Sequence, residues 1–174
     1  MEAIRFCDMN LAGREVIAER QRKEMGIIAH TMEYRGDILF SDMKLRNYSD
    51  IDYLEYKKIY EDCFFEMRTA LGLLPVNCCG KRENLQKKRN KIFILEESGR
   101  LIGSIAIYGN EIDDLIVAKE VQGQGYGQSL LKFAICHMQS NGVSPICLHV
   151  ADWNQKAVRM YLKNGFFITK TEIV

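Results

Sequence analysis

The most informative stretch of the chain is Gln122-Gly123-Gln124-Gly125-Tyr126-Gly127. It follows an apolar run, Leu115-Ile116-Val117, and precedes a helix-like run over residues 128–140. Glycines let the backbone approach a ligand closely, and the unpaired N–H groups and partial positive charge of a helix N-terminus attract anions. A strand, a glycine-rich turn and a helix start in this order therefore predict a binding site for a phosphate-bearing ligand.

Two familiar phosphate-binding motifs do not fit this turn. The dinucleotide fingerprint G-x-G-x-x-G needs its third glycine one position after Gly127, and an acidic residue about twenty residues further on, where this chain has Cys147. The Walker motif needs a lysine, but Gly127 is followed by Gln128 and Ser129. The pattern that remains is Q-x-x-G-x-G, at Gln122, Gly125 and Gly127.

Length and charge limit the functional classes. At 174 residues the chain suits one domain with a buried core, and its net charge of +1 favours neither nucleic acid nor an anionic membrane as a partner. No apolar run approaches the roughly eighteen residues that a membrane helix needs, and residues 1–10 do not resemble a secretory signal. None of the six cysteines forms a C-x-x-C pair, so we expect reduced thiols, no metal site and a cytoplasmic location.

The segments around the glycine turn predict an α/β (α+β) fold. Apolar runs at residues 92–95 and 101–108 are joined by hairpin-turn chemistry, and a third run, at 111–117, leads into the turn. The helix at 128–140 has core spacing, and the strand expected at 146–151 should run parallel to the strand at 111–117 through a right-handed crossover. These elements predict a mixed, mostly antiparallel sheet with helices on both faces.

The two ends of the chain are expected to differ. Residues 1–42 contain many helix formers with irregular apolar spacing, which predicts an N-terminal helical extension that packs on the domain or on a second copy of the chain in a homodimer. Residues 43–48 alternate as a strand, and Ser49 or Asp50 caps an aromatic helix after it. Asp152 or Asn154 caps a last helix, and residues 166–174 close the chain as a strand.

A second motif begins at Leu148 and reads L-H-V-A-D-W-N-Q-K-A-V-R-M-Y-L-K-N-G-F. Its Asn154, Ala157, Tyr161 and Gly165-Phe166 fall at the spacing of the second signature of the GNAT superfamily of N-acetyltransferases, and Q-x-x-G-x-G resembles that family's coenzyme A pyrophosphate loop. The resemblance covers residues 43–174. It implies acetyl-coenzyme A as the cosubstrate, without a metal, in a cleft between two splayed parallel strands.

The resemblance also assigns contacts with the cofactor. Leu115-Ile116-Val117 would offer a strand edge to the pantetheine arm, whose amides can bond such an edge like another strand. The turn would hold the pyrophosphate, and Asn154 would bond the pantetheine side. The implied cofactor-binding residues are Leu115, Ile116, Val117, Gln122, Gly123, Gln124, Gly125, Tyr126, Gly127, Gln128 and Asn154.

The reaction that the resemblance implies is direct attack of a primary amine on the thioester, through a tetrahedral intermediate, with Tyr161 near the sulfur. Glu111 matches the glutamate base of the histone acetyltransferase branch. His149 stands where ribosomal-protein N-terminal acetyltransferases carry a glutamate, and an imidazole titrates nearer to neutral pH than a carboxylate does. Glu111, His149 and a chain of waters all remain candidates for the base.

The acceptor is not identified by the sequence. A small molecule or a peptide that carries an amine fits the motifs equally well. An acyltransferase that uses a longer acyl group, or a non-enzymatic module that binds acyl-coenzyme A as a regulatory signal, would carry the same motifs. The hydroxyl of Tyr161, which the resemblance places near the thioester sulfur, favours an enzyme over the binding module.

Overall fold

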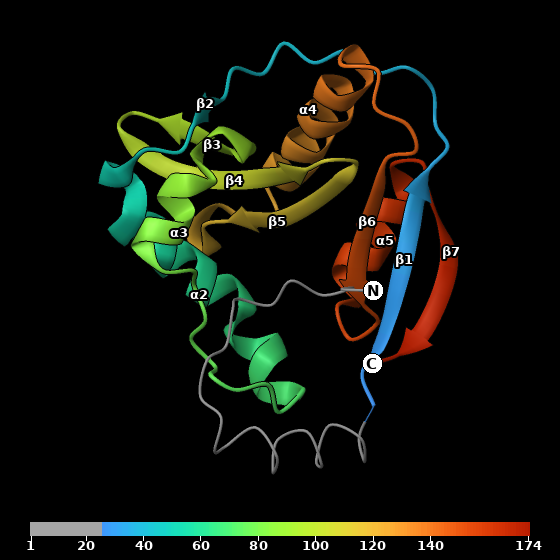
Figure 1. Cartoon of the computed structure of the whole chain (residues 1–174), viewed down its shortest axis with the longest axis horizontal. Helices are drawn as coiled ribbons and strands as arrows, with labels where there is room; N and C mark the ends of the chain where they lie inside the picture. The colour runs from blue at the N-terminus through green and yellow to red at the C-terminus, as the bar shows by residue number, and fades with distance from the viewer. Residues whose placement is uncertain (1–25) are drawn as a thin grey trace.

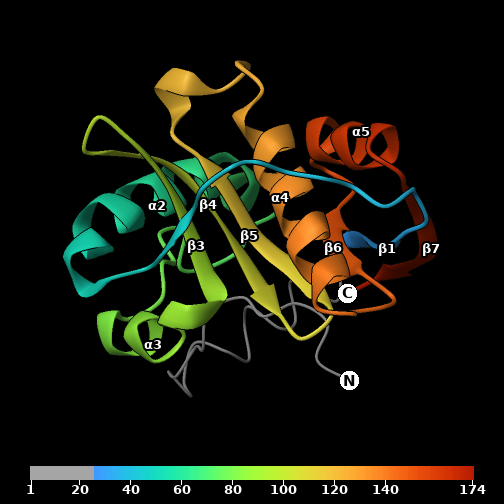
Figure 2. The same ribbon diagram turned by 90° about the horizontal axis from the view of Figure 1, so that it is seen from above.

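Seven strands form one mixed sheet in the order β2-β3-β4-β5-β6-β1-β7 (Figures 1 and 2). The structure, a computed structural model, describes residues 26–174. Its strands are β1 (Ile28–Tyr34), β2 (Arg46–Asn47), β3 (Ile92–Glu97), β4 (Arg100–Tyr108), β5 (Glu111–Val117), β6 (Cys147–Ala151) and β7 (Phe166–Ile173). Its helices are α2 (Tyr53–Ala70), α3 (Arg82–Lys87), α4 (Tyr126–Ser140) and α5 (Gln155–Lys163), with short 3-10 turns at Asp50–Asp52, Arg89–Lys91 and Lys119–Val121. The predicted mixed sheet with helices on both faces is confirmed.

The two parallel strands of the sheet separate along their length. β5 and β6 pair where both begin, Glu111 with Cys147 and Ile112 with Leu148. Figure 1 shows the two ribbons diverging from that end, β5 turning toward β4 and β6 continuing beside β1. The helix between them, α4, makes the crossover that the sequence predicted. The predicted parallel pair is therefore confirmed, and its carboxyl ends are splayed.

Two hydrophobic clusters pack on opposite faces of this sheet. One includes α4 side chains and buried residues of β5 and β6 such as Ile112, Leu148 and Val150. The other lies between α2 and the first half of the sheet, with Tyr56, Ile59 and Ile116 among its members. Because successive side chains of a strand point to opposite faces, Glu111 and Asp113 lie on the opposite face from Ile112, where α2 packs.

The strand β1 differs from the helical extension that we predicted over residues 1–42. It pairs with β6 from Ala29–Ala151 to Glu33–Cys147, and with β7 on its other edge. Its side chains alternate across the sheet, and Met32 is fully buried in the α4 cluster. The helix formers upstream concealed this short alternation. Residues 1–25 of the predicted extension lie outside the described residues.

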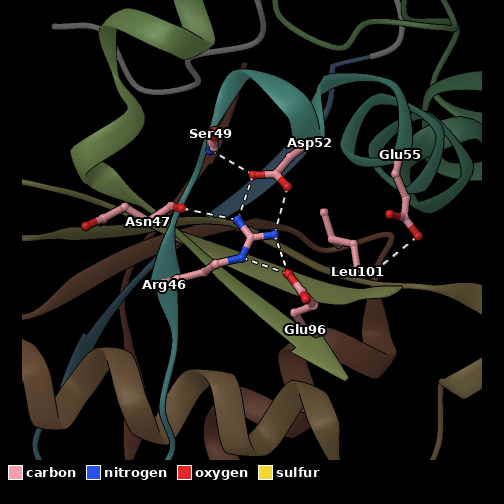
Figure 3. A network of polar contacts seen from close by, with 7 residues as sticks. All are labelled: Arg46, Asn47, Ser49, Asp52, Glu55, Glu96 and Leu101. Carbon is pink, nitrogen blue, oxygen red and sulfur yellow. Dashed lines mark hydrogen bonds and ion pairs between the residues drawn. The ribbon is translucent and has the colours of Figure 1, made fainter. Parts of the chain in front are cut away.

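An ion-pair network fixes the start of α2 to the sheet (Figure 3). The Arg46 guanidinium donates two hydrogen bonds of 2.8 Å to the Asp52 carboxylate, and its Nε donates to Glu96 Oε2 at 2.8 Å. The backbone N–H of Ser49 donates to Asp52 Oδ2 at 2.7 Å. Burial favours the neutral form of Asp52, but the hydrogen bonds from Arg46 and Ser49 outweigh it and lower its pKa. The strand predicted at 43–48 is shorter than expected, because pairing with β3 involves Arg46 and Asn47.

We predict that Asp52→Asn lowers the free energy of unfolding by about 1–3 kcal/mol near neutral pH, since it leaves the Arg46 charge without its bidentate partner. Arg46 is 41% exposed, so solvent screening places the loss toward the lower end. A lowered carboxyl pKa stabilises the fold above the unfolded value of about 3.9 and loses that stabilisation as the pH falls further. Urea unfolding at pH 7 and pH 3 measures both effects.

The matched control is Asp50→Asn, which breaks the ion pair of Asp50 with Arg82, where both side chains are 49% exposed. Its effect should be much smaller than that of Asp52→Asn. Equal losses for the two variants would contradict a special role for the Arg46 network.

Candidate active site

The glycine turn leaves open space in front of the α4 N-terminus. Gly125 is the N-cap residue of α4 with a left-handed φ of 93°, and Gly123 has a φ of 81°. A Cβ built at either position meets no atom within 4 Å. The first N–H groups of a helix have no partner within the helix, so those of the Tyr126 end face this space. The turn can therefore place backbone N–H groups against an anion.

Side chains of the turn anchor it to its neighbours. The Gln122 amide donates to the carbonyl oxygen of Val117 at 2.9 Å, and the Cys63 thiol on α2 contacts the same oxygen at 3.2 Å. The Tyr126 hydroxyl donates to Glu97 Oε2 on β3 at 2.8 Å. Gln122 and Tyr126 were predicted to bind the cofactor, and these contacts give their side chains a further role in holding the turn against β5 and β3.

The predicted strand edge, Leu115-Ile116-Val117, lies on the diverging half of β5. Ile116 is buried under α2, whereas Leu115 and Val117 pack on the α4 side. An irregularity in the pairing of β4 with β5 lies between Asp113 and Ile116, and there Asp114 adopts a φ of 48°. Asp114 accepts a hydrogen bond of 2.8 Å from Tyr60 of α2, and its pKa is raised by burial and by the neighbouring Asp113. This irregularity turns the end of β5 relative to its start.

Tyr161 and Asn154 come from the second motif. The Tyr161 ring is buried in the α4 cluster, with its centroid 5.9 Å from that of Phe166. Burial raises the pKa of the Tyr161 phenol, and the negative charge of Asp113 on β5 raises it further. Of the two predicted caps, Asp152 and Asn154, it is Asn154 that caps α5, because its side-chain oxygen accepts the Ala157 N–H at 3.1 Å. The raised pKa keeps the Tyr161 phenol protonated across the physiological pH range.

The two residues predicted as alternative bases lie next to each other. His149 Nε2 is 3.7 Å from Glu111 Oε1, and His149 Nδ1 is 3.2 Å from the hydroxyl oxygen of Thr31. Glu111 begins β5, His149 lies in the middle of β6, and Thr31 is the direct partner of His149 on β1. The acid–base groups thus form a row across three strands, on the face opposite the α4 cluster.

Sequence reasoning missed Thr31 and the effect of Asp113 on Tyr161. Thr31 was hidden because its strand, residues 28–34, was predicted as part of a helical extension. The negative charge of Asp113 on β5 raises the pKa of Tyr161 on α5, and no sequence pattern indicates that these two residues lie near each other. Within residues 26–174 there is no group of three or more His, Cys, Asp or Glu side chains that could hold a metal ion. No helix in that range is both long and apolar enough to cross a membrane.

Comparison with known proteins agrees with the fold and the motifs. Residues 53–166 match the acetyltransferase (GNAT) family. The chain is 32% identical over 80 residues to the mycothiol acetyltransferase of Propionibacterium freudenreichii subsp. shermanii, a match that covers 46% of this chain and 23% of that protein. It therefore spans less than a quarter of the length of that curated relative.

Solved structures show the same fold at low sequence identity. A GNAT-family protein from Novosphingobium aromaticivorans is 19% identical with a TM-score of 0.61, over 83% of this chain and 61% of that one. The PaiA N-acetyltransferase of Thermoplasma acidophilum, in complex with coenzyme A, is 19% identical with a TM-score of 0.59, over 74% of this chain and 92% of that one.

We predict that Gly125→Val abolishes binding of acetyl-coenzyme A, because it strains the left-handed N-cap and fills the open space in front of α4. Isothermal titration calorimetry measures the binding. The control is Gly142→Val at the other end of α4, where φ is 68° and the space is also open. Both variants should lose stability by about 1–2 kcal/mol. Affinity within threefold of wild type for Gly125→Val would remove the turn from the binding site.

Proposed function

The chain belongs to the acetyltransferase (GNAT) family, and from that premise we propose that it transfers an acetyl group from acetyl-coenzyme A to a primary amine. The observation that carries the proposal is the divergence of β5 from β6 between a helix N-terminus and an acid–base row. A thioester placed in that gap would have Tyr161 on the α4 side and Glu111 with His149 on the α2 side. The acyl group would then face the incoming amine.

The cofactor would follow the turn and the edge of β5. The pyrophosphate would accept hydrogen bonds from backbone N–H groups of Gly123 to Gln128, in the open space before α4. The pantetheine amides would pair with the diverging half of β5, at Leu115 to Val117. Asn154, at the start of α5, would contact the other side of the arm.

Deprotonation of the amine is the more demanding proton transfer. An alkylammonium with a pKa near 10.4 loses its proton at a cost of about 4 kcal/mol at pH 7.4. The departing thiolate, with a thiol pKa near 8.5, is already a fair leaving group. Because the pKa of Tyr161 is raised by burial and Asp113, complete proton donation is unfavourable. Tyr161 would therefore stabilise the developing thiolate by donating a hydrogen bond.

Direct attack by the amine is favoured over a covalent acyl-enzyme. Burial raises the pKa of both Cys63 and Cys147, and Glu33 and Glu111 raise that of Cys147 further. Only the thiolate is an effective nucleophile, so these thiols are poorly prepared for acyl transfer. The amine itself would attack the carbonyl carbon, and its proton would pass to the pair formed by Glu111 and His149.

Two other functions share this geometry. An acyltransferase for a longer acyl group would use the same turn, and a regulatory module would bind acyl-coenzyme A without turnover. The protonated Tyr161 phenol and the adjacent Glu111 and His149 favour an enzyme, because a binding module needs neither. A thiol-release assay with a panel of amines and of acyl-coenzyme A chain lengths tests the proposal. If none of the amines in the panel leads to thiol release, the regulatory module is favoured.

We predict that Tyr161→Phe lowers kcat by about 100-fold and leaves the affinity for acetyl-coenzyme A nearly unchanged, since only the hydroxyl is lost. The matched control is Tyr34→Phe, another tyrosine that packs against Phe166, with a centroid distance of 5.3 Å. Its kcat should equal that of wild type. An unchanged kcat for Tyr161→Phe between pH 6 and 9 would assign Tyr161 to the core alone.

We also predict that the double variant Glu111→Gln with His149→Gln loses the acidic limb of the kcat/KM profile, together with about 100-fold or more in rate. Neither amide takes up a proton in this range. Because the substrate amine also titrates, the profile should be measured with two acceptors of different basicity. A limb that survives in the double variant and moves with the acceptor would place the proton on water.

A further inference from the structure

Thr31 contacts the imidazole that stands in the acid–base row. It comes from β1, where it lies directly opposite His149 of β6. Its hydroxyl oxygen is 3.2 Å from His149 Nδ1, and the other ring nitrogen, Nε2, is 3.7 Å from Glu111 Oε1. Each nitrogen of His149 thus faces a different oxygen, one a hydroxyl and the other a carboxylate.

The two neighbours differ in the proton positions that they allow on the His149 ring. The Thr31 hydroxyl can accept or donate a hydrogen bond, whereas the Glu111 carboxylate can only accept one. A neutral imidazole carries one N–H and one lone pair. A proton on Nδ1 would direct the Nε2 lone pair at the Glu111 carboxylate, which is repulsive. A proton on Nε2 directs an N–H at the carboxylate instead, and the Thr31 hydroxyl can donate to Nδ1 because a hydroxyl is both donor and acceptor.

The surrounding charges act in the same direction. Glu33 of β1 and Glu111 of β5 flank Cys147, the residue of β6 two positions before His149, and both raise the pKa of its thiol. Asp113 follows Glu111 on the same face of β5. The Glu111 carboxylate thus stands on the Nε2 side of the ring, and a carboxylate oxygen favours an N–H over a lone pair at Nε2.

We propose that Thr31 is a positioning residue that holds His149 in the Nε2–H form, so that Glu111 takes the proton of the attacking amine. This assignment rests on the proposed function and identifies the Glu111 carboxylate as the group that accepts the proton. The ammonium N–H bond breaks and its proton moves to the Glu111 carboxylate. The nitrogen lone pair then forms the bond to the acyl carbon and gives a tetrahedral intermediate. When the C–S bond breaks, the nitrogen loses its second proton to the departing thiolate sulfur, so that the amide and the free thiol are released. His149, with its Nδ1 lone pair bound by Thr31, orients the carboxylate through Nε2–H.

The direct test is the tautomer of His149, read from the nitrogen-15 chemical shifts of its ring in the full chain above the pH at which the ring is protonated. Wild type should show the proton on Nε2. Thr31→Val, which removes the hydroxyl but keeps the shape, should show a mixture of both tautomers and a kcat lowered by about tenfold. Thr31→Ser should restore both the spectrum and the rate, and Thr169→Val, whose hydroxyl contacts the Thr31 backbone, should change neither.

The rates of two further variants separate the base from its neighbour. Glu111→Gln should lower kcat by about 100-fold or more, because the group that accepts the proton is lost. His149→Gln should cost about tenfold or less, because its amide can still donate toward Glu111. A larger loss for His149→Gln than for Glu111→Gln would overturn the assignment.

The spectrum needs no turnover, so the inference and the proposed function can fail separately. A proton on Nδ1 in wild type overturns the role of Thr31 even where acetyl transfer is observed, and this holds whether or not Thr31→Val folds. An unchanged tautomer and kcat in folded Thr31→Val overturns it as well. A wild type with the Nε2–H form that acetylates no amine supports the positioning by Thr31 and contradicts the proposed function.

Discussion

The divergence of two parallel strands is the constraint on which the rest of the structure depends. β5 and β6 pair at their first residues, where Ile112 and Leu148 enter the same cluster under α4. Beyond that point β5 continues to pair with β4, with an irregularity near Asp114, while β6 pairs with β1 on its other edge. Unpaired backbone groups would be costly in a buried strand, so the gap between the strands is suited to a ligand that can pair with them.

The divergence also separates the two groups to which the proposed reaction assigns proton handling. The Tyr161 phenol is buried with α4 and α5 on one face, and Glu111 lies with His149 on the other. Charge nevertheless acts across the gap, because Asp113 raises the pKa of Tyr161. A raised pKa makes the phenol a donor that keeps its proton, while the carboxylates of the other face favour cations. In the proposed reaction, the same few residues of β5 therefore support a hydrogen-bond donor on one face and a proton acceptor on the other.

The sequence predicted those features of the arrangement that depend on neighbouring residues, and it did not predict those that depend on residues far apart in the chain. The glycine turn before α4 and the cap of α5 depend on neighbouring residues and were read from short motifs, with Asn154 as one of two predicted caps. The crossover through α4 was read from the order of the elements. β1 depends on partners far along the chain, since Thr31 and His149 are 118 positions apart. No local pattern indicates which partner a seven-residue strand will join. The adjacency of Glu111 and His149, predicted as alternatives, was likewise visible only once the strands were aligned.

The position of β1 makes the acid–base row dependent on contacts at its other face. His30, next to Thr31, points to the opposite side. Its Nδ1 lies 2.9 Å from the Thr171 hydroxyl of β7, and its Nε2 lies 2.9 Å from Oδ1 of Asp152, the residue after β6. Those partners are 141 and 122 positions away in sequence, so β1 is ordered by pairings that form across nearly the whole chain. A half-ångström shift of β1 would weaken the contact between Thr31 and His149, because hydrogen bonds lose strength steeply with distance and angle. The buried His30 thereby contributes to the geometry of a row of residues that it does not touch.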